Sequence, residues 1–334
     1  MIVLQTVISL LPVFLFLIAL ILLDSFKLVK FRYVAFTLLY GAVVSLFCYF
    51  FNGWFKVVLN IEWQSYTRYV APPVEEFFKA VYIYIMLRKD RIGFAVDAAI
   101  FGFAIGSGFA FVENIYYLIL LEEDNLLIWI IRGFGTAVMH GSTTAIFALV
   151  LKSLTDRSSR KSAWLFLPGF IVTSILHSFF NHFVVAPATL TIGQLIILPA
   201  LVVFVFADSE RRLRAWLETG LDTDVRLLEY ITTGEISKTR IGQYLLVLKE
   251  KLSGEIIADM LCYLRIYLEL AIRSKGYLMM RENGFQTTPD PDIKAKLTEL
   301  DYLESSIGQT GKLALGPIFG RDKLSRWQIQ MLRE

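Results

Sequence analysis

Cysteine and charge are both scarce in this chain, and their scarcity excludes several classes of protein. Two cysteines occur among 334 residues, Cys48 in an apolar run and Cys262 in a polar region, so no disulfide framework is expected. Charged residues make up 19% of the chain and the net charge is +3. A charge this small gives no reason to expect a nucleic-acid partner, and none is predicted.

Signals of export and of a one-helix metal site are missing as well. The first apolar segment has neither a basic leading region nor a small-residue cleavage site, which predicts an uncleaved anchor. The chain contains no HExxH motif, so ligand spacing along a single helix does not predict a metal. No internal repeat and no low-complexity tract is evident.

Apolar residues are what the chain has in excess. They make up 56% of the sequence, and the mean hydropathy is +0.57. Runs of about 20 apolar residues match the thickness of a bilayer when they are helical. The predicted fold class is therefore all-α, a polytopic transmembrane helical bundle of about seven spans. The predicted spans are residues 3–23, 33–52, 66–87, 93–120, 126–151, 163–185 and 189–206.

Basic residues gather in alternate loops, which fixes the predicted orientation. These loops follow the first, third, fifth and seventh spans, near residues 27–32, 88–91, 152–161 and 211–214. The positive-inside rule places such loops in the cytoplasm. We therefore expect a multi-pass protein of the plasma membrane, with its N-terminus outside and its C-terminus in the cytoplasm.

The composition changes near residue 207, from apolar to mixed charge. We expect a transmembrane domain over residues 1–207 and a cytoplasmic, mainly helical domain over residues 208–334. Apolar residues recur at helical spacing in 254–275, but charged residues interrupt them, which favours a packed or membrane-surface helix over an eighth span. The residues of this second domain indicate no particular role.

Three ionisable residues fall inside the third predicted span. Glu75, Glu76 and Lys79 lie in 66–87, although an ionisable side chain costs about 2.5 to 3.5 kcal/mol at the centre of a bilayer. Lys79 is one helical turn from both glutamates and can neutralise one of them. The other is then available as a general base. Two prolines just before the pair predict a helix that is broken or begins late, beside a wet cavity.

Polar side chains in later spans lie at a similar depth. Glu113 and His177 are about eight or nine helical residues from the outer ends of their spans, as Glu75 is, whereas His140 is about 8 Å deeper. We expect all four to approach one site in the outer half of the membrane. Two imidazoles and the Glu113 carboxylate form a credible Zn²⁺ shell, with Glu75 or Glu76 activating water.

Two of these histidines have a hydrogen-bonding residue four positions further on, on the same helix face. Asn181 follows His177, and Thr144 follows His140. Such neighbours can orient an imidazole, fix its tautomer or hold a reacting oxyanion. Asn181 is therefore a candidate catalytic residue.

Less specific interpretations of the same residues stay open. Glu75 and Glu76 can form a structural ion pair with Lys79 or Arg132 that joins helices. The polar set can also serve a proton- or ion-coupled transporter, although no inverted repeat is evident. A third possibility is a non-catalytic membrane scaffold that uses the polar cluster for assembly.

Four short motifs, each inside a predicted span, carry a family resemblance. They are EExxK at Glu75 to Lys79, FxxxE ending at Glu113, the histidine His140, and HxxxN at His177 to Asn181. Over about residues 1–207 the chain resembles the PrsW intramembrane proteases. These are distant relatives of the type II CAAX prenyl endopeptidases, which differ by an arginine after the paired glutamates and a histidine in the second motif.

The resemblance implies hydrolysis of a peptide bond in a membrane-anchored, single-span protein, such as an anti-sigma factor. It implies that Glu75 and Glu76 activate water, and that Glu113, His140 and His177 bind a metal or stabilise the transition state. Zn²⁺ is the expected cofactor, and a metal-free mechanism with glutamate and histidine stays the alternative. The expected partners are this substrate and the lipid bilayer, and no oligomeric state is predicted.

Overall fold

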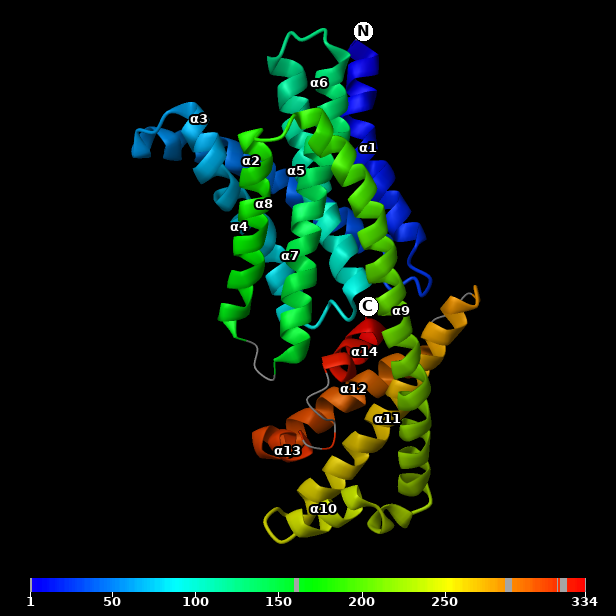
Figure 1. The fold of residues 1–334 in the computed structure, drawn as a ribbon. Coiled ribbons are helices and arrows are strands. Elements are labelled where there is room, and N and C mark those ends of the chain that lie inside the picture. Colours follow the sequence, from blue (N-terminus) through cyan, green and yellow to red (C-terminus); the bar gives the residue numbers. More distant parts are fainter. Residues whose placement is uncertain (1, 159–161, 286–289, 317, 319–322, 334) are drawn as a thin grey trace. The chain divides into compact units, whose positions relative to one another are not determined.

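A computed structural model describes residues 2–158, 162–285, 290–316, 318 and 323–333 of the chain. Every regular element among these residues is a helix, and none is a strand (Figure 1). The chain divides into two compact units, Met1–Ser209 and Glu210–Glu334. The predicted all-α fold is confirmed.

The first unit is built from long apolar helices. Its helices are α1 (Ile2–Leu22), α2 (Phe31–Leu59), α3 (Trp63–Ser65), α4 (Ala71–Arg88), α5 (Ala95–Leu120), α6 (Leu126–Ile130), α7 (Val138–Arg157), α8 (Phe166–His182) and the first part of α9 (Pro187–Thr232). Six helical segments in the described part of the chain are long and apolar enough to cross a membrane. The remaining predicted span, residues 66–87, is not among these six. It contains α4, which carries Glu75, Glu76, Lys79 and Arg88.

Two π-helical segments interrupt the α-helical pattern, each a short distance before residues of interest. Tyr66–Val70 leads into α4, and Ile131–Ala137 joins α6 to α7. The first is followed by Pro72 and Pro73 at the start of α4, where proline is tolerated because the first N–H groups of a helix have no helical acceptor. The expectation that the helix is broken or begins late at the prolines is wrong, because helical backbone runs without a gap from Trp63 through the π-helical turn into α4.

Helix α5 occupies the centre of the first unit, packed between α2 and α7. Small residues along it let its neighbours approach closely. A Cβ atom on Gly106 would lie 2.1 Å from the backbone oxygen of His140 on α7. A Cβ on Gly108 would lie 1.9 Å from the backbone oxygen of Leu38 on α2. Such small residues are the usual means of close helix packing in a membrane.

Replacing Gly106 with alanine is therefore expected to lower the thermal stability of the protein in detergent. The added methyl meets backbone atoms of α7 that cannot rotate away, and overpacking of this kind costs about 1 to 3 kcal/mol. Gly53→Ala is the matched control, since nothing lies within 4 Å of a Cβ at that position. Equal melting temperatures for the two variants would contradict this account of the α5–α7 contact.

The second unit packs several helices around α11 (Gly254–Glu282). These are α10 (Arg240–Leu248), α12 (Pro291–Ser306), α13 (Gly308–Leu315) and α14 (Lys323–Arg333), after the remainder of α9. Leu270 of α11, Leu300 of α12 and Ile329 of α14 share one core. Arg333 donates to both carboxylate oxygens of Asp301, and this guanidinium lowers the pKa of the Asp301 carboxyl.

The change of composition near residue 207 does not coincide with a break in the chain's direction. Helix α9 runs without interruption from Pro187 to Thr232. The residues after 207 are strong helix formers without proline, so the helix continues while its surface changes from apolar to charged. The boundary therefore shows in the composition and not in the secondary structure.

Candidate functional site

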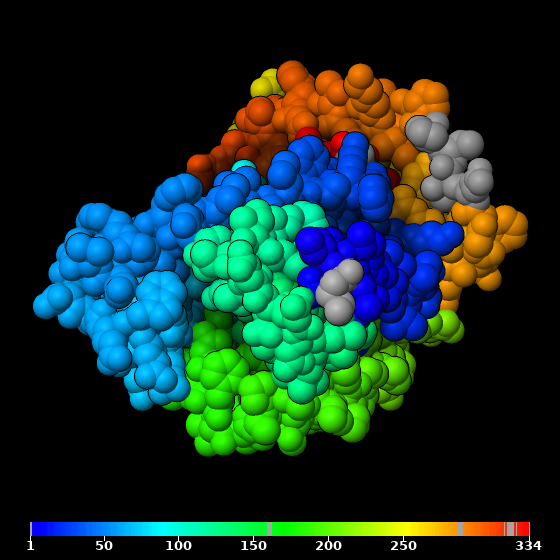
Figure 2. Space-filling view, turned by 90° about the horizontal axis from the view of Figure 1, so that it is seen from above, coloured from blue at the N-terminus to red at the C-terminus, as the bar shows by residue number. Residues whose placement is uncertain are grey.

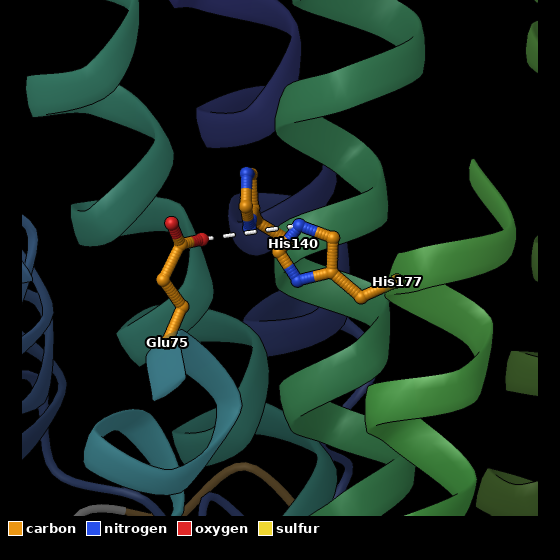
Figure 3. Close-up of side chains that lie close together, drawn as sticks. All are labelled: Glu75, His140 and His177. Carbon is orange, nitrogen blue, oxygen red and sulfur yellow. Dashed lines mark ion pairs between the residues drawn. The ribbon is translucent and has the colours of Figure 1, made fainter. Parts of the chain in front are cut away.

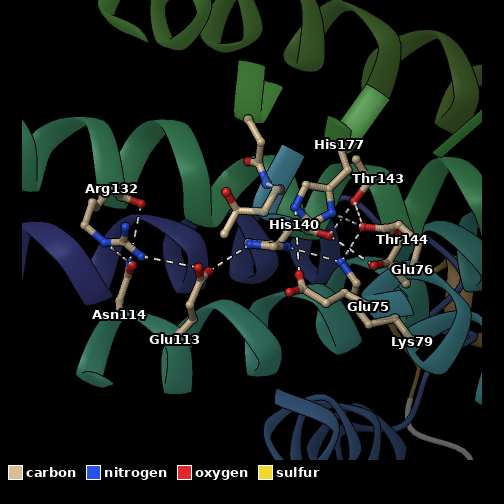
Figure 4. A network of polar contacts seen from close by, with 12 residues as sticks. Glu75, Glu76, Lys79, Glu113, Asn114, Arg132, His140, Thr143, Thr144 and His177 are labelled. Carbon is tan, nitrogen blue, oxygen red and sulfur yellow. Dashed lines mark hydrogen bonds and ion pairs between the residues drawn. The ribbon is translucent and has the colours of Figure 1, made fainter. Parts of the chain in front are cut away.

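Polar side chains from four helices meet inside the first unit. Glu75, Glu76 and Lys79 come from the first turns of α4, Glu113 from α5, His140 from the start of α7 and His177 from α8. Figure 4 shows them joined in one network of hydrogen bonds and ion pairs. The structure brings these residues together, as expected, and His140 contacts Glu113 directly. The depth difference of about 8 Å expected for His140 was calculated for straight, untilted α-helices without a π-helical segment.

Glu76 and Lys79 form a buried ion pair at the base of the network. Their side chains are 1% and 0% exposed, and Nζ lies 2.5 Å from Oε1 of Glu76. The same oxygen accepts a hydrogen bond from Thr143 Oγ1 at 3.1 Å and lies 2.9 Å from Nδ1 of His177. Lys79 Nζ also lies 3.2 Å from Nδ1 of His140. One oxygen of Glu76, Oε1, thus contacts Lys79, Thr143 and His177.

The contact with Glu76 sets the orientation of the His177 ring. A neutral imidazole that donates from Nδ1 to a carboxylate keeps its lone pair on Nε2. Nε2 faces the other glutamate and lies 3.8 Å from Oε2 of Glu75 (Figure 3). Carboxylate–imidazole pairs of this kind accompany most metal-binding histidines.

Glu75 is the carboxylate that remains available. Its Oε1 accepts a hydrogen bond from Asn52 Nδ2 at 3.1 Å, and Tyr66 in turn donates to Oδ1 of Asn52 at 2.9 Å. Its other oxygen points toward His177. The Glu75 side chain is 16% exposed, against 1% for Glu76. The two adjacent glutamates therefore differ in role, because one is anchored and buried while the other reaches the surface.

Glu113 lies on the far side of His140. Its Oε2 is 2.8 Å from Nε2 of His140, and its Oε1 is 3.6 Å from the guanidinium of Arg132. Arg132 also donates from Nε to Asn114 Oδ1 at 3.0 Å and lies 3.6 Å from the centre of the Tyr117 ring. Glu113 and His140 thus form a second carboxylate–imidazole pair, and Arg132 contacts the other oxygen of this carboxylate.

Three donors in the described part of the chain could hold a metal ion. Ligand atoms of Glu75, His140 and His177 all lie within 4.8 Å of one another. Two imidazoles and one carboxylate are the protein ligands of many catalytic zinc sites. The types of donor fit a divalent metal, but both ring nitrogens of His140 have partners, Lys79 at Nδ1 and Glu113 at Nε2, so His140 would bind the ion only after one of these contacts is released.

This donor set differs from the predicted one in a single residue. Glu113 was expected beside His140 and His177, whereas Glu75 takes that place in the group. Glu113 contacts the Nε2 atom of His140 instead, where a carboxylate orients the ring. Sequence position could not separate these roles, because both glutamates lie at a similar depth.

One end of the bundle is hollowed, and we call this hollow the recess. Figure 2 shows the surface hollowed between the light-blue lobe, which ends at α4, and the blue-green and green segments beside it. Glu75 and Glu113 are the partly exposed members of the network, at 16% and 26%. Water can therefore reach the carboxylates from this end.

Comparison with protein families agrees with this geometry. The model of the PrsW family intramembrane metalloproteases matches residues 30–207. The chain belongs to this family. No curated protein and no solved structure matches it. The matched region contains every residue of the network, so the chain is an integral membrane protein with an intramembrane protease domain.

Two expected companions of the histidines bind elsewhere in this PrsW-family domain. Asn181 donates from Nδ2 to the backbone oxygen of Thr67 at 3.1 Å. Thr144 donates to the backbone oxygen of His140 at 3.0 Å, four residues earlier on its own helix. Neither side chain is hydrogen-bonded to an imidazole among the described residues. Both side chains lie on the same helix face as a histidine, as predicted, but each binds a backbone carbonyl instead of the imidazole.

Four residues of the network were not singled out as site residues from the sequence. They are Asn52, Tyr66, Arg132 and Thr143. Each is a polar or amphipathic residue within or beside an apolar run, a weak signal because single residues of this kind are common in membrane helices. Arg132 was considered as a partner for Glu75 or Glu76 and as a snorkelling residue or a partner of Glu122 or Glu123, whereas it pairs with Glu113.

Replacing Arg132 with methionine is expected to reduce both cleavage and metal affinity by about 10- to 100-fold, the usual effect of removing an outer partner of a metal-binding histidine. Without the guanidinium, Glu113 is free to turn away from His140. Arg132→Lys keeps the charge but loses the Nε contact to Asn114, so an intermediate value is expected. Unchanged activity and metal affinity in Arg132→Met would show that Glu113 needs no support.

Proposed function

We propose that the chain is an endopeptidase that hydrolyses a peptide bond of a membrane-anchored, single-span protein. One observation carries the proposal. The partly exposed Glu75 directs a free carboxylate oxygen toward Nε2 of His177, beside His140. A carboxylate and two oriented imidazoles that water can reach, inside an apolar bundle, suit hydrolysis better than they suit a purely structural ion pair.

The side chains would divide the work as follows. Glu75 accepts a proton from the attacking water, as a general base with one oxygen fixed by Asn52. Glu76 keeps the His177 ring in one orientation, and Glu113 does the same for His140. A divalent metal such as Zn²⁺ would be held by His140 and His177, with Glu75 as the third ligand if it does not serve as the base, and it would polarise the scissile carbonyl and acidify water. The alternative is a mechanism in which Glu75 and the two histidines act alone.

The substrate and the side of cleavage follow from the loops and from the recess. If the basic loops face the cytoplasm, the recess opens on the extracytoplasmic side, and cleavage occurs near that boundary of the substrate's span. A regulatory protein such as an anti-sigma factor is the kind of substrate that the family suggests. The second unit then lies in the cytoplasm, and the protein resides in the plasma membrane. Hydrolysis requires the recess, because a bilayer core offers an unwound peptide no hydrogen-bonding partners.

The test uses the full chain reconstituted in liposomes with a candidate single-span substrate. We expect cleavage by the wild type, loss of cleavage with a chelator, recovery with added Zn²⁺, and no cleavage by His177→Gln. Mass spectrometry of the products locates the cut. Cleavage that resists a chelator while His177→Gln stays inactive would favour the metal-free alternative. Proton or solute flux through the liposomes with no cleavage of any substrate would favour a transporter.

A further inference from the structure

The two prolines before Glu75 remove hydrogen-bond donors at the point where the chain is π-helical. In a π-helix the N–H of one residue donates to the carbonyl five positions earlier, and Ala71 does so toward Tyr66. The next two carbonyls, of Thr67 and Arg68, would receive the N–H groups of residues 72 and 73. Both of these are proline and have none. The sequence thus leaves two adjacent carbonyls without a helical donor.

Two side chains of α8 supply the missing hydrogen bonds. Asn181 donates from Nδ2 to the Thr67 oxygen at 3.1 Å. Ser178 donates from Oγ to the Arg68 oxygen at 2.5 Å. An unpaired carbonyl is unfavourable in an apolar bundle, and these two partly buried bonds supply both carbonyls with a donor. Helix α8 is fixed at these two points to the segment that leads into α4.

The same short stretch of α8 carries His177. Ser178 is the next residue, and Asn181 is one turn further on. His177 contacts Glu76 at 2.9 Å and faces Glu75 at 3.8 Å, and both glutamates leave α4 just after the proline pair. A movement of α8 of about 1 Å relative to α4 would disturb both distances, and misplacements of that size can cost about 100-fold in rate.

We propose that Ser178 and Asn181 are positioning residues, which bind the two carbonyls that Pro72 and Pro73 leave free and so hold His177 against Glu75 and Glu76. Asn181 acts through the placement of α8 and does not touch the reacting atoms. The effect on cleavage rests on the proposed function, whereas the effect on helix position does not. The experiment therefore measures both.

The cleavage measurements compare variants along one helix. Ser178→Ala and Asn181→Ala are each expected to lower the cleavage rate by about 10- to 100-fold, in line with a small misplacement of a reacting group. Ser178→Thr keeps a hydroxyl and should retain most of the activity. Ser174→Ala is the matched control, because the Ser174 hydroxyl has no hydrogen-bond partner among the residues that the structure describes. A role of Asn181 at the oxyanion would instead leave Ser178→Ala fully active.

The positional measurement needs no substrate. Spin labels are placed at Trp63 and Ile175, which are 56% and 61% exposed, in a Cys262→Ser background in which Cys48 stays buried. Double electron–electron resonance should give one narrow distance distribution in the wild type. It should broaden in Ser178→Ala/Asn181→Ala and stay narrow in Ser174→Ala. A narrow distribution in the double variant overturns the proposal, even if no substrate is ever cleaved.

If Asn181→Ala folds poorly, a second substitution in the same chain still tests the proposal. Pro72→Ala supplies an N–H five residues after Thr67, so Asn181→Ala/Pro72→Ala should recover the expression and thermal stability of the wild type. Its distance distribution should nevertheless be broader than that of the wild type and its cleavage rate lower, because only the Ser178 bond then holds α8 to the segment before α4. Recovery of a narrow distribution in this variant would overturn the proposal.

Discussion

Glutamine at position 75 is expected to abolish cleavage while leaving the fold intact. The amide has the shape of the carboxylate and can still accept from Asn52, but it cannot take a proton from water. Loss of a general base lowers a rate by about 10²- to 10⁴-fold. The initial cleavage rate in liposomes gives the loss, and thermal unfolding in detergent checks the fold. Glu122→Gln, an exposed glutamate in the loop before α6, is the control and should be fully active.

Metal content separates the two ways in which Glu75 can act. If Glu75 serves mainly as the base, the purified Glu75→Gln protein keeps the metal of the wild type and loses only cleavage. If it serves mainly as a ligand, metal and cleavage are lost together. Substantial cleavage by Glu75→Gln would remove Glu75 from the mechanism altogether. Glu76 and Glu113 would then be the other carboxylates of the network, and Glu76 is already bound to Lys79, Thr143 and His177.

The sequence predicted the members of the site better than it predicted their contacts. Glu75, Glu76, Glu113, His140 and His177 were found because ionisable groups in apolar runs are costly and therefore informative. The pairing of Glu76 with Lys79 follows from helical spacing alone, and the structure has it. Contacts between helices depend on rotation and tilt about each axis, which hydropathy does not determine. For that reason the carboxylate predicted to bind a metal together with the two histidines was Glu113, whereas Glu75 is the one grouped with them.

Local irregularity accounts for the other differences. Periodicity of 3.6 residues identifies an α-helix but gives no signal for a π-helical turn such as Tyr66–Val70. The sequence therefore contained no sign that the carbonyls of Thr67 and Arg68 lack a helical donor. For that reason Asn181 was predicted to hold an oxyanion, whereas it binds the Thr67 carbonyl. The proline pair was visible from the start, but its consequence depends on which helix lies beside it. Only the packing of α8 against that segment supplies the answer.

Methionine at position 79 is expected to cause the largest loss of stability in the protein. Lys79 is fully buried and lies between Glu76, Nδ1 of His140 and the face of the Phe109 ring. Its removal leaves the Glu76 carboxylate, 1% exposed, without a cation. Breaking a buried ion pair from one side costs about 3 to 5 kcal/mol. Lys89→Met, at an exposed position after α4, should change stability by less than about 0.5 kcal/mol.

The double variant Glu76→Gln/Lys79→Met tests whether this cost comes from the unpaired charge. Removing both partners leaves neither of them as an unpaired buried charge, so much of the lost stability should return, as in other proteins where buried pairs were replaced together. Cleavage should not return, because a glutamine at position 76 no longer holds His177 by its charge. Thermal unfolding in detergent and the cleavage rate are measured on the same samples. A double variant as unstable as Lys79→Met would mean that the lysine stabilises the bundle by packing, and that the ion pair is secondary.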